Sequence, residues 1–157
     1  MFNLLLLVFN ICYNFIVPPM PYIKGDGFLY DYFRLYQIIL ETIRDKYPDS
    51  GQQLIIHLSD DPYIVQLRTS IPDAKLISEI LCVLDNLIDD GFVNARRTVS
   101  KDLTLYVIDG ITTSGRKFLT ESENLSFSKT FKKFLKENGL PLSPQSVSKF
   151  IAKVIFR

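Results

Sequence analysis

The chain has little of what metal and covalent chemistry needs: one histidine, two cysteines and no tryptophan among 157 residues. A lone His57 cannot form a histidine cluster for a metal, and Cys12 and Cys82 cannot form a disulfide framework. The sequence also has no phosphate loop ending in GK[ST], no nucleophile elbow and no Cys/His pair. We therefore expect a protein that is not an enzyme, holds no metal, needs no cofactor and occupies a reducing cytoplasm.

What is present favours a folded chain. Hydrophobic residues make up 47% of the sequence, which includes 12 Phe and 8 Tyr. That content excludes intrinsic disorder, and the length fits one domain with a small appendage. We find no internal repeat and no low-complexity segment.

The formal net charge of +1 conceals two halves of opposite sign. Residues 20–95 contain 6 Lys or Arg and 12 Asp or Glu, whereas residues 96–157 contain 12 and 5. A basic half often meets a polyanion such as DNA. The two halves could equally attract each other, within the monomer or between copies.

The first 17 residues, MFNLLLLVFNICYNFIV, are strongly apolar and end at Pro18-Pro19. The run is slightly short for a membrane-spanning helix and contains three Asn. It lacks the basic start and small-residue cleavage site of a signal peptide. We expect a mis-assigned start, with translation beginning at Met20; a membrane or signal segment and a buried first helix stay open.

The most informative stretch begins with a predicted helix over residues 73–90. Asp73 is expected to be its N-cap, and Gly91 is expected to end it in a left-handed conformation. Apolar residues recur at three- and four-residue steps, which is typical of one buried face. They are Leu76, Ile77, Ile80, Leu81, Val83, Leu84, Leu87 and Ile88.

A β hairpin and a short helix are predicted next. Residues 92–95 and 103–108 have the apolar and β-branched composition of strands, and the basic segment 96–102 is expected to be the loop between them. We expect Gly110 to break the chain and Thr112 or Thr113 to cap a helix that ends at Leu119.

This order of elements is that of a winged helix, with the polar loop as the wing. The motif LxxLIDDGFV followed by IDGITTSGRKFL resembles the YjcQ-like winged-helix proteins, a small family of bacteria and phages. The matching residues are Leu84, Leu87, Ile88, Gly91, Phe92, Val93, Ile108, Gly110, Ile111, Thr112, Gly115, Phe118 and Leu119. Arg116 departs from the family pattern, in which a histidine is expected. The resemblance covers about a third of the chain and implies a fold more than an activity.

Upstream of this unit, residues 20–29 are expected to form a loop and residues 31–46 an amphipathic helix. Residues 52–58, QQLIIHL, are predicted to be a short strand that leaves His57 partly exposed. Asp60-Asp61-Pro62 is typical of a helix start, and a helix is expected over residues 63–70. The two aspartates are therefore read as caps and not as paired catalytic acids.

Downstream, two amphipathic helices are predicted, from Ser126 or Ser128 to Asn138 and from Ser143-Pro144 to the end of the chain. Phenylalanines line one face of the first helix and lysines the other. The pair loosely resembles a helix-turn-helix, although its turn is long. Packing on the rest of the protein with a solvated lysine face, or lying on an anionic membrane, are the alternatives.

We therefore predict a mostly α (α+β) fold. Residues 1–19 form an apolar segment, 20–120 a winged-helix domain with a hairpin wing, and 121–157 a basic helical hairpin. The expected partner is DNA, and the expected role is a regulator or accessory factor. The predicted phosphate-binding residues are Arg96, Arg97, Lys101, Lys129, Lys132, Lys133, Lys136, Lys149 and Lys153.

The helix over residues 73–90 argues against the usual docking mode. Its expected exposed face carries Asp73, Glu79, Asp85, Asp89 and Asp90 against Lys75 alone. DNA phosphates repel such a face, so the wing and tail would dominate binding. The alternative is a protein-interaction module in which the acidic helix meets a basic partner or a second copy. A membrane partner is expected only if residues 1–17 belong to the protein.

Overall fold

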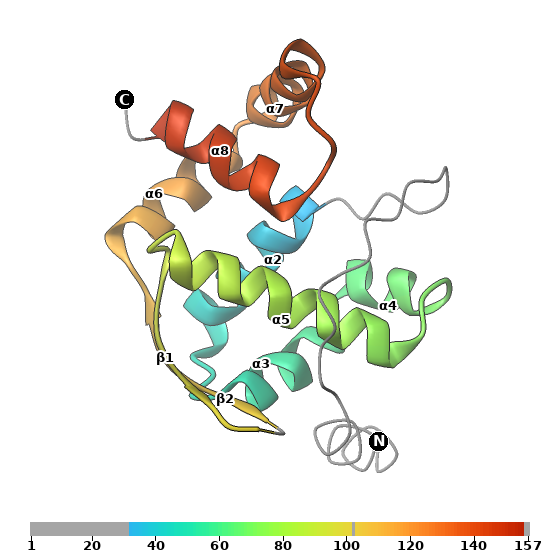
Figure 1. Cartoon of the computed structure of the whole chain (residues 1–157), viewed down its shortest axis with the longest axis vertical. Helices are drawn as coiled ribbons and strands as arrows, with labels where there is room; N and C mark the ends of the chain where they lie inside the picture. The colour runs from blue at the N-terminus through green and yellow to red at the C-terminus, as the bar shows by residue number, and fades with distance from the viewer. Residues whose placement is uncertain (1–31, 102, 156–157) are drawn as a thin grey trace.

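The computed structural model describes residues 32–101 and 103–155, and Figure 1 shows their helices with one two-stranded sheet at the edge of the molecule. The elements are α2 (Tyr32–Lys46), α3 (Gly51–Leu58), α4 (Pro62–Arg68), α5 (Asp73–Asp89), β1 (Val93–Val99), β2 (Thr104–Ile111), α6 (Thr113–Ser122), α7 (Leu125–Asn138) and α8 (Pro144–Ile155). The predicted mostly helical fold with a β hairpin, like that of a winged helix, is confirmed. The predictions for residues 1–17 and 20–29 lie outside the described residues.

Helix α5 runs through the middle of the molecule, between α2, α3 and α8 (Figure 1). The predicted apolar stripe is confirmed, since Ile80, Val83, Leu84 and Leu87 are all at most 2% exposed. Gly91 has φ 74° after the last turn, as predicted. The predicted Asp73 cap is wrong: Pro72 precedes the helix, no side chain caps it, and Asp73 lies in its first turn.

The hairpin is longer and its loop shorter than the sequence predicted. Arg96 and Arg97 lie within β1, where they pair with Val107 and Tyr106, so the expected loop over residues 96–102 is wrong. Gly110 does not break the chain either. It lies in β2 with φ 133°, opposite Asn94, where a bulge interrupts the register.

The predicted strand over residues 52–58 is wrong, because these residues belong to helix α3. Ser50 caps that helix, its side chain accepting from the Gln53 amide at 3.3 Å. A third strand is reduced to one position, where Ser50 pairs with Val107 and the Ile108 amide donates to the Asp49 carbonyl. His57 is consequently an exposed residue of a helix.

The predicted starts of α4 and α6 are confirmed. The Asp61 carboxylate accepts from the amides of Tyr63 and Ile64 at the start of α4, with Pro62 in the first turn. The Thr112 hydroxyl accepts from the Gly115 amide at 3.1 Å at the start of α6. The Thr112 hydroxyl also donates to the Gly91 carbonyl, so it ties α6 to the end of α5.

An aromatic cluster joins the C-terminal helices to the rest of the core. Phe118 of α6 stacks on Phe92 at 5.5 Å and packs edge-on against Phe33 of α2. From α7, Phe127 packs against Phe33, Phe118 and Phe150 of α8. Offset and edge-to-face rings at these distances stabilise a core beyond their buried area. Helices α7 and α8 therefore share the core of α2 and α6.

Candidate nucleic-acid interface

The wing arginines lie close to carboxylates. Arg97 extends from β1 over α5, where it donates to Asp85 at 3.0 Å and also to Asp89. These two bonds, first that to Asp89 and then that to Asp85, raise the pKa of Arg97. Its guanidinium is already occupied, and a DNA phosphate would have to compete with two carboxylates for it.

Tyr106 reinforces this contact from the neighbouring strand. Its hydroxyl donates to Asp85 at 3.1 Å, and its ring is 8% exposed against the core. Burial, followed by the Asp85 charge, raises the pKa of this phenol. Both strands of the hairpin are therefore tied to α5.

The other two wing cations are more exposed. Arg96 lies 3.9 Å from Asp109 across the hairpin, and its side chain is 74% exposed. Lys101 is exposed in the turn, which is closed by the Ser100 amide donating to the Leu103 carbonyl. Arg96 and Lys101 are thus the wing cations exposed to solvent.

The acidic face of α5 is smaller than the sequence suggested. Glu79 is not exposed as expected: it is 6% exposed and accepts a hydrogen bond from Tyr32. Asp73 pairs with Arg68, and Asp85 and Asp89 pair with Arg97. Most carboxylates of this helix are therefore engaged by the chain's own side chains.

Helix α7 presents a face of four exposed lysines, which we call the lysine face. It consists of Lys129, Lys132, Lys133 and Lys136. At 3.6 residues per turn, these positions lie on the side of the helix opposite the buried Phe127 and Phe131. Within the described residues, the one acid paired with this face is Glu137, 3.7 Å from Lys133.

Helix α8 adds two exposed lysines beside α7. The Lys153 ammonium lies 5.3 Å from the centre of the Phe134 ring of α7, a cation–π distance. Lys149 lies one turn earlier and is also exposed. The α7 and α8 lysines that the sequence singled out therefore come from adjacent helices.

The two basic regions are not brought together. In Figure 1, α7 lies at the top of the molecule and the turn of the hairpin lies at the bottom. Lys101 is in that turn, whereas the lysine face is on α7. The lysine face and the wing are therefore two separate basic regions of the surface.

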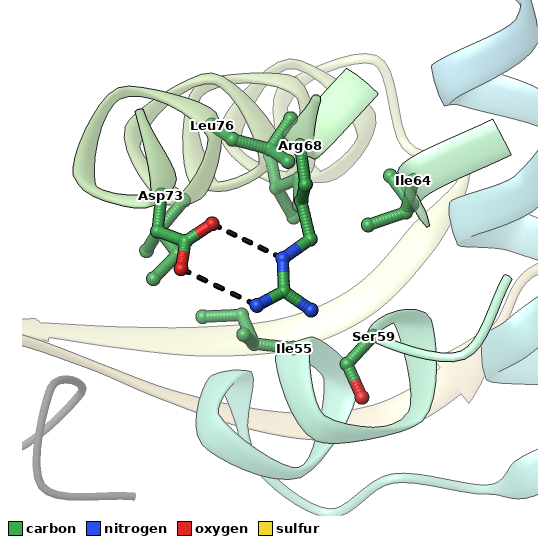
Figure 2. Close-up of a pocket in the computed structure, with 8 residues that line it drawn as sticks. Ile55, Ser59, Ile64, Arg68, Asp73 and Leu76 are labelled. Carbon is green, nitrogen blue, oxygen red and sulfur yellow. Dashed lines mark hydrogen bonds and ion pairs between the residues drawn. The ribbon is translucent and has the colours of Figure 1, made fainter. Parts of the chain in front are cut away.

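A small apolar recess lies between α3, α4 and α5. Figure 2 shows Arg68 and Asp73 at this recess, with Ile55, Ile64 and Leu76 around them. Two hydrogen bonds, of 3.1 and 3.3 Å, join the guanidinium to the carboxylate. The recess has a volume of about 30 Å³, well below the ~150 Å³ of a cavity that holds benzene, so it is too small to enclose such a ligand.

In the part of the chain that the structure describes, no group of three His, Cys, Asp or Glu residues could hold a metal ion. The thiol of Cys82 is half-buried, and that burial raises its pKa, which lowers its reactivity.

Two aliphatic side chains of the hairpin are exposed, which the strand prediction alone does not indicate. They are Leu105 and Val107, which are 56% and 43% exposed. The alternation with the buried Tyr106 and Ile108 is the signal that could have revealed them.

Comparison with known proteins gave no match: no family model, no curated protein and no solved structure matches the chain. Among the described helices, none is both long and apolar enough to cross a membrane.

Proposed function

We propose that this chain is a non-catalytic, DNA-associated protein of winged-helix type that grips the phosphate backbone with the lysine face of α7. The observation that carries the proposal is the placement of four exposed lysines opposite the buried phenylalanine stripe, with a single acid paired to them. Backbone neutralisation by such cations supplies most of the affinity of sequence-independent binding.

The paired state of the wing supports this choice of surface. Arg97 is held by Asp85 and Asp89, and Arg96 lies near Asp109. The wing then contributes the exposed Lys101 and the weakly paired Arg96. Lys149 and Lys153 add two exposed cations on the neighbouring helix α8. A regulator or accessory factor in the cytoplasm of a bacterium or phage host, as the YjcQ-like resemblance suggests, would bind DNA in this backbone-directed way.

The experiment is fluorescence anisotropy of the full chain with a labelled duplex of about 20 base pairs over a salt series. The slope of log K against log salt is about −0.9 per phosphate contact, so each lost contact makes it less negative by about 0.9. K132Q/K136Q, which removes two lysines one turn apart, should therefore make the slope less negative by about 1.8. The matched control K46Q/K75Q removes two exposed lysines from α2 and α5 and should leave binding unchanged.

A second pair of variants separates the two surfaces. R96Q/K101Q tests the wing, and its slope should change by less than that of K132Q/K136Q. If the slope changes more in R96Q/K101Q than in K132Q/K136Q, the wing makes the larger contribution to DNA binding. If the folded wild type does not bind at low salt, or if K46Q/K75Q loses as much as K132Q/K136Q, the proposal fails.

A protein-interaction module is the second candidate, and the exposed Leu105 and Val107 favour it. The acidic helix has less support as a docking surface for a basic partner, since the chain's own arginines already engage Asp73, Asp85 and Asp89.

A further inference from the structure

Exposed aliphatic side chains gather on the β hairpin. Leu105 and Val107 of β2 are 56% and 43% exposed and lie two residues apart, so they share one face of the hairpin. Val99 is 75% exposed, but it pairs with Thr104 and lies on the opposite face. Single exposed aliphatics are common on protein surfaces, whereas clusters of them mark interaction sites. This cluster lies along the hairpin, at the edge of the molecule in Figure 1.

The strand register defines one outward face. Thr98 is paired with Leu105 and Arg96 with Val107, while Tyr106 and Ile108 point into the core. Paired residues lie on the same side of a sheet. We call this surface the outer hairpin face, and it consists of Arg96, Thr98, Leu105, Val107 and Asp109.

The charges on this face are balanced. Arg96 and Asp109 are its only charged residues, and they lie 3.9 Å apart with side chains that are 74% and 43% exposed. A strongly basic or acidic partner would leave one of the two charges facing its own sign. A surface with a central aliphatic pair and one charge of each sign is instead complementary to itself.

We propose that the outer hairpin face is the interface of a homodimer, in which two hairpins pack face to face about a two-fold axis. When the two-fold axis is parallel to the strands and lies between the two hairpins, Val107 of one copy lies over the aliphatic part of the Arg96 side chain of the other copy. Each Arg96 then reaches Asp109 of the partner, so the weak pair within one copy is exchanged for pairs between copies. Leu105 packs beside Thr98 of the partner.

This dimer does not depend on DNA binding, because α7 lies at the other end of the molecule from the hairpin turn (Figure 1). The two lysine faces would remain accessible. Because the apolar part of each face is two aliphatic side chains, the interface belongs to the small, transient class, with a dissociation constant of about 10–100 µM.

The test is sedimentation equilibrium of the full chain, with concentrations up to about 300 µM to span that range. The wild type should move from 18.1 kDa toward twice that mass as its concentration rises. L105K/V107K should remain a monomer throughout. The matched control I56K/V65K introduces two lysines at exposed aliphatic positions of α3 and α4, and it should associate like the wild type.

A charge exchange tests the pairing without altering the aliphatic centre. Arg96→Asp should weaken association about tenfold, which corresponds to 1.4 kcal/mol. The double variant R96D/D109R should restore it. Circular dichroism confirms that each variant is folded, and because the residues exchanged are exposed, R96D remains informative even if L105K/V107K unfolds.

The proposal is overturned if the wild type is a monomer at every concentration. It is equally overturned if I56K/V65K dissociates as much as L105K/V107K, or if R96D/D109R associates as weakly as R96D. Failure of DNA binding in the salt series would leave these outcomes unchanged, so the two proposals can fail separately.

Discussion

The guanidinium of Arg97 on β1 donates to the carboxylate of Asp89 in the last turn of α5. That turn carries no basic residue of its own, and carboxylates at the negative end of a helix dipole destabilise it. Arg97 therefore supplies, from the hairpin, the positive charge that the helix end lacks. The same contact fixes the hairpin to the helix that precedes it.

Removing this arginine should leave the unfavourable interaction between the Asp89 carboxylate and the C-terminal end of α5 without the positive charge that offsets it. Arg97→Ala is expected to lower the free energy of unfolding by about 1 kcal/mol, with a larger loss at low salt. Asp89→Asn should be nearly neutral in the wild type but stabilising in the Arg97→Ala background. Urea unfolding of the four proteins in this double-mutant cycle measures the coupling between the two residues. A coupling of zero would contradict the argument.

A second prediction concerns the close approach of α6 to the end of α5. A Cβ on Gly115 would lie 2.3 Å from the Phe92 carbonyl oxygen, which also accepts from the Thr112 amide. Because backbone cannot yield as a side chain does, Gly115→Ala should cost about 2–3 kcal/mol of stability. The exposed neighbour Thr113 provides the control: Thr113→Ala should change stability by less than about 0.5 kcal/mol. Similar stabilities of the two variants would show that α6 can shift.

Much of this packing could be predicted from local sequence. The three- and four-residue spacing of apolar residues identified α5 and its end at Gly91, and the Thr112 cap placed α6. These features depend on residues a few positions apart, which is why a single sequence reveals them. The phenylalanine stripe of α7 likewise indicated where its lysines would be.

The strand prediction over residues 52–58 failed because this short apolar segment also has helical spacing. The buried residues Leu54, Ile55 and Leu58 fit one helical face. A stronger signal lay just before them: Ser50 and Gln53 follow the S-x-x-Q pattern of a capping box. In the structure the Gln53 side chain accepts from the Asp49 amide, while Ser50 accepts from the Gln53 amide.

The candidate site was harder to predict because its decisive contacts are long-range. Nothing near Arg97 in the sequence indicates that Asp85 and Asp89 occupy its guanidinium. The expected Asp73 cap failed for a different reason: the helix begins one residue earlier, so Asp73 lies in its first turn. Whether a charged side chain is free to bind a ligand depends on contacts that the fold creates. Whether its residue lies in a helix or a strand depends mainly on the local sequence pattern.

A third prediction follows from the end of α2. Tyr47 has φ 51° and is 78% exposed, while its amide donates to the Ile43 carbonyl as in a left-handed helix cap. This position favours glycine, because a Cβ there costs about 1–2 kcal/mol. Tyr47→Gly should therefore raise the free energy of unfolding, by about 0.5–1 kcal/mol after the greater chain entropy of glycine is counted. Lys46→Gly, one residue earlier in the helix, should lower it by about 1 kcal/mol. Thermal unfolding that ranks the two variants in the opposite order would show that the tyrosine side chain stabilises the fold.

The last prediction concerns Asp90, which follows α5 and faces α8. Ser148 donates to its carboxylate at 2.6 Å, and the Ser148 hydroxyl also hydrogen-bonds Tyr36. Burial raises the pKa of Asp90, and nearby Asp89 adds to that effect, although the bond from Ser148 opposes it. The folded protein thus retains this proton to a higher pH than the unfolded chain does. Stability from this group is highest below the unfolded pKa of about 3.9 and falls as pH rises through the folded value.

Asp90→Asn tests this sign directly. The amide can still accept from Ser148 but never ionises, so the variant should be more stable than the wild type at pH 7. The difference should shrink as pH falls and vanish below about pH 3.5, where the wild-type carboxyl is protonated in both states. Urea unfolding at several pH values measures it, with Asp60→Asn in an exposed turn as a control that should follow the wild type. A variant less stable than the wild type at pH 7 would mean that the charged form of Asp90 holds α8 against α5 through Ser148, and the burial argument would be wrong.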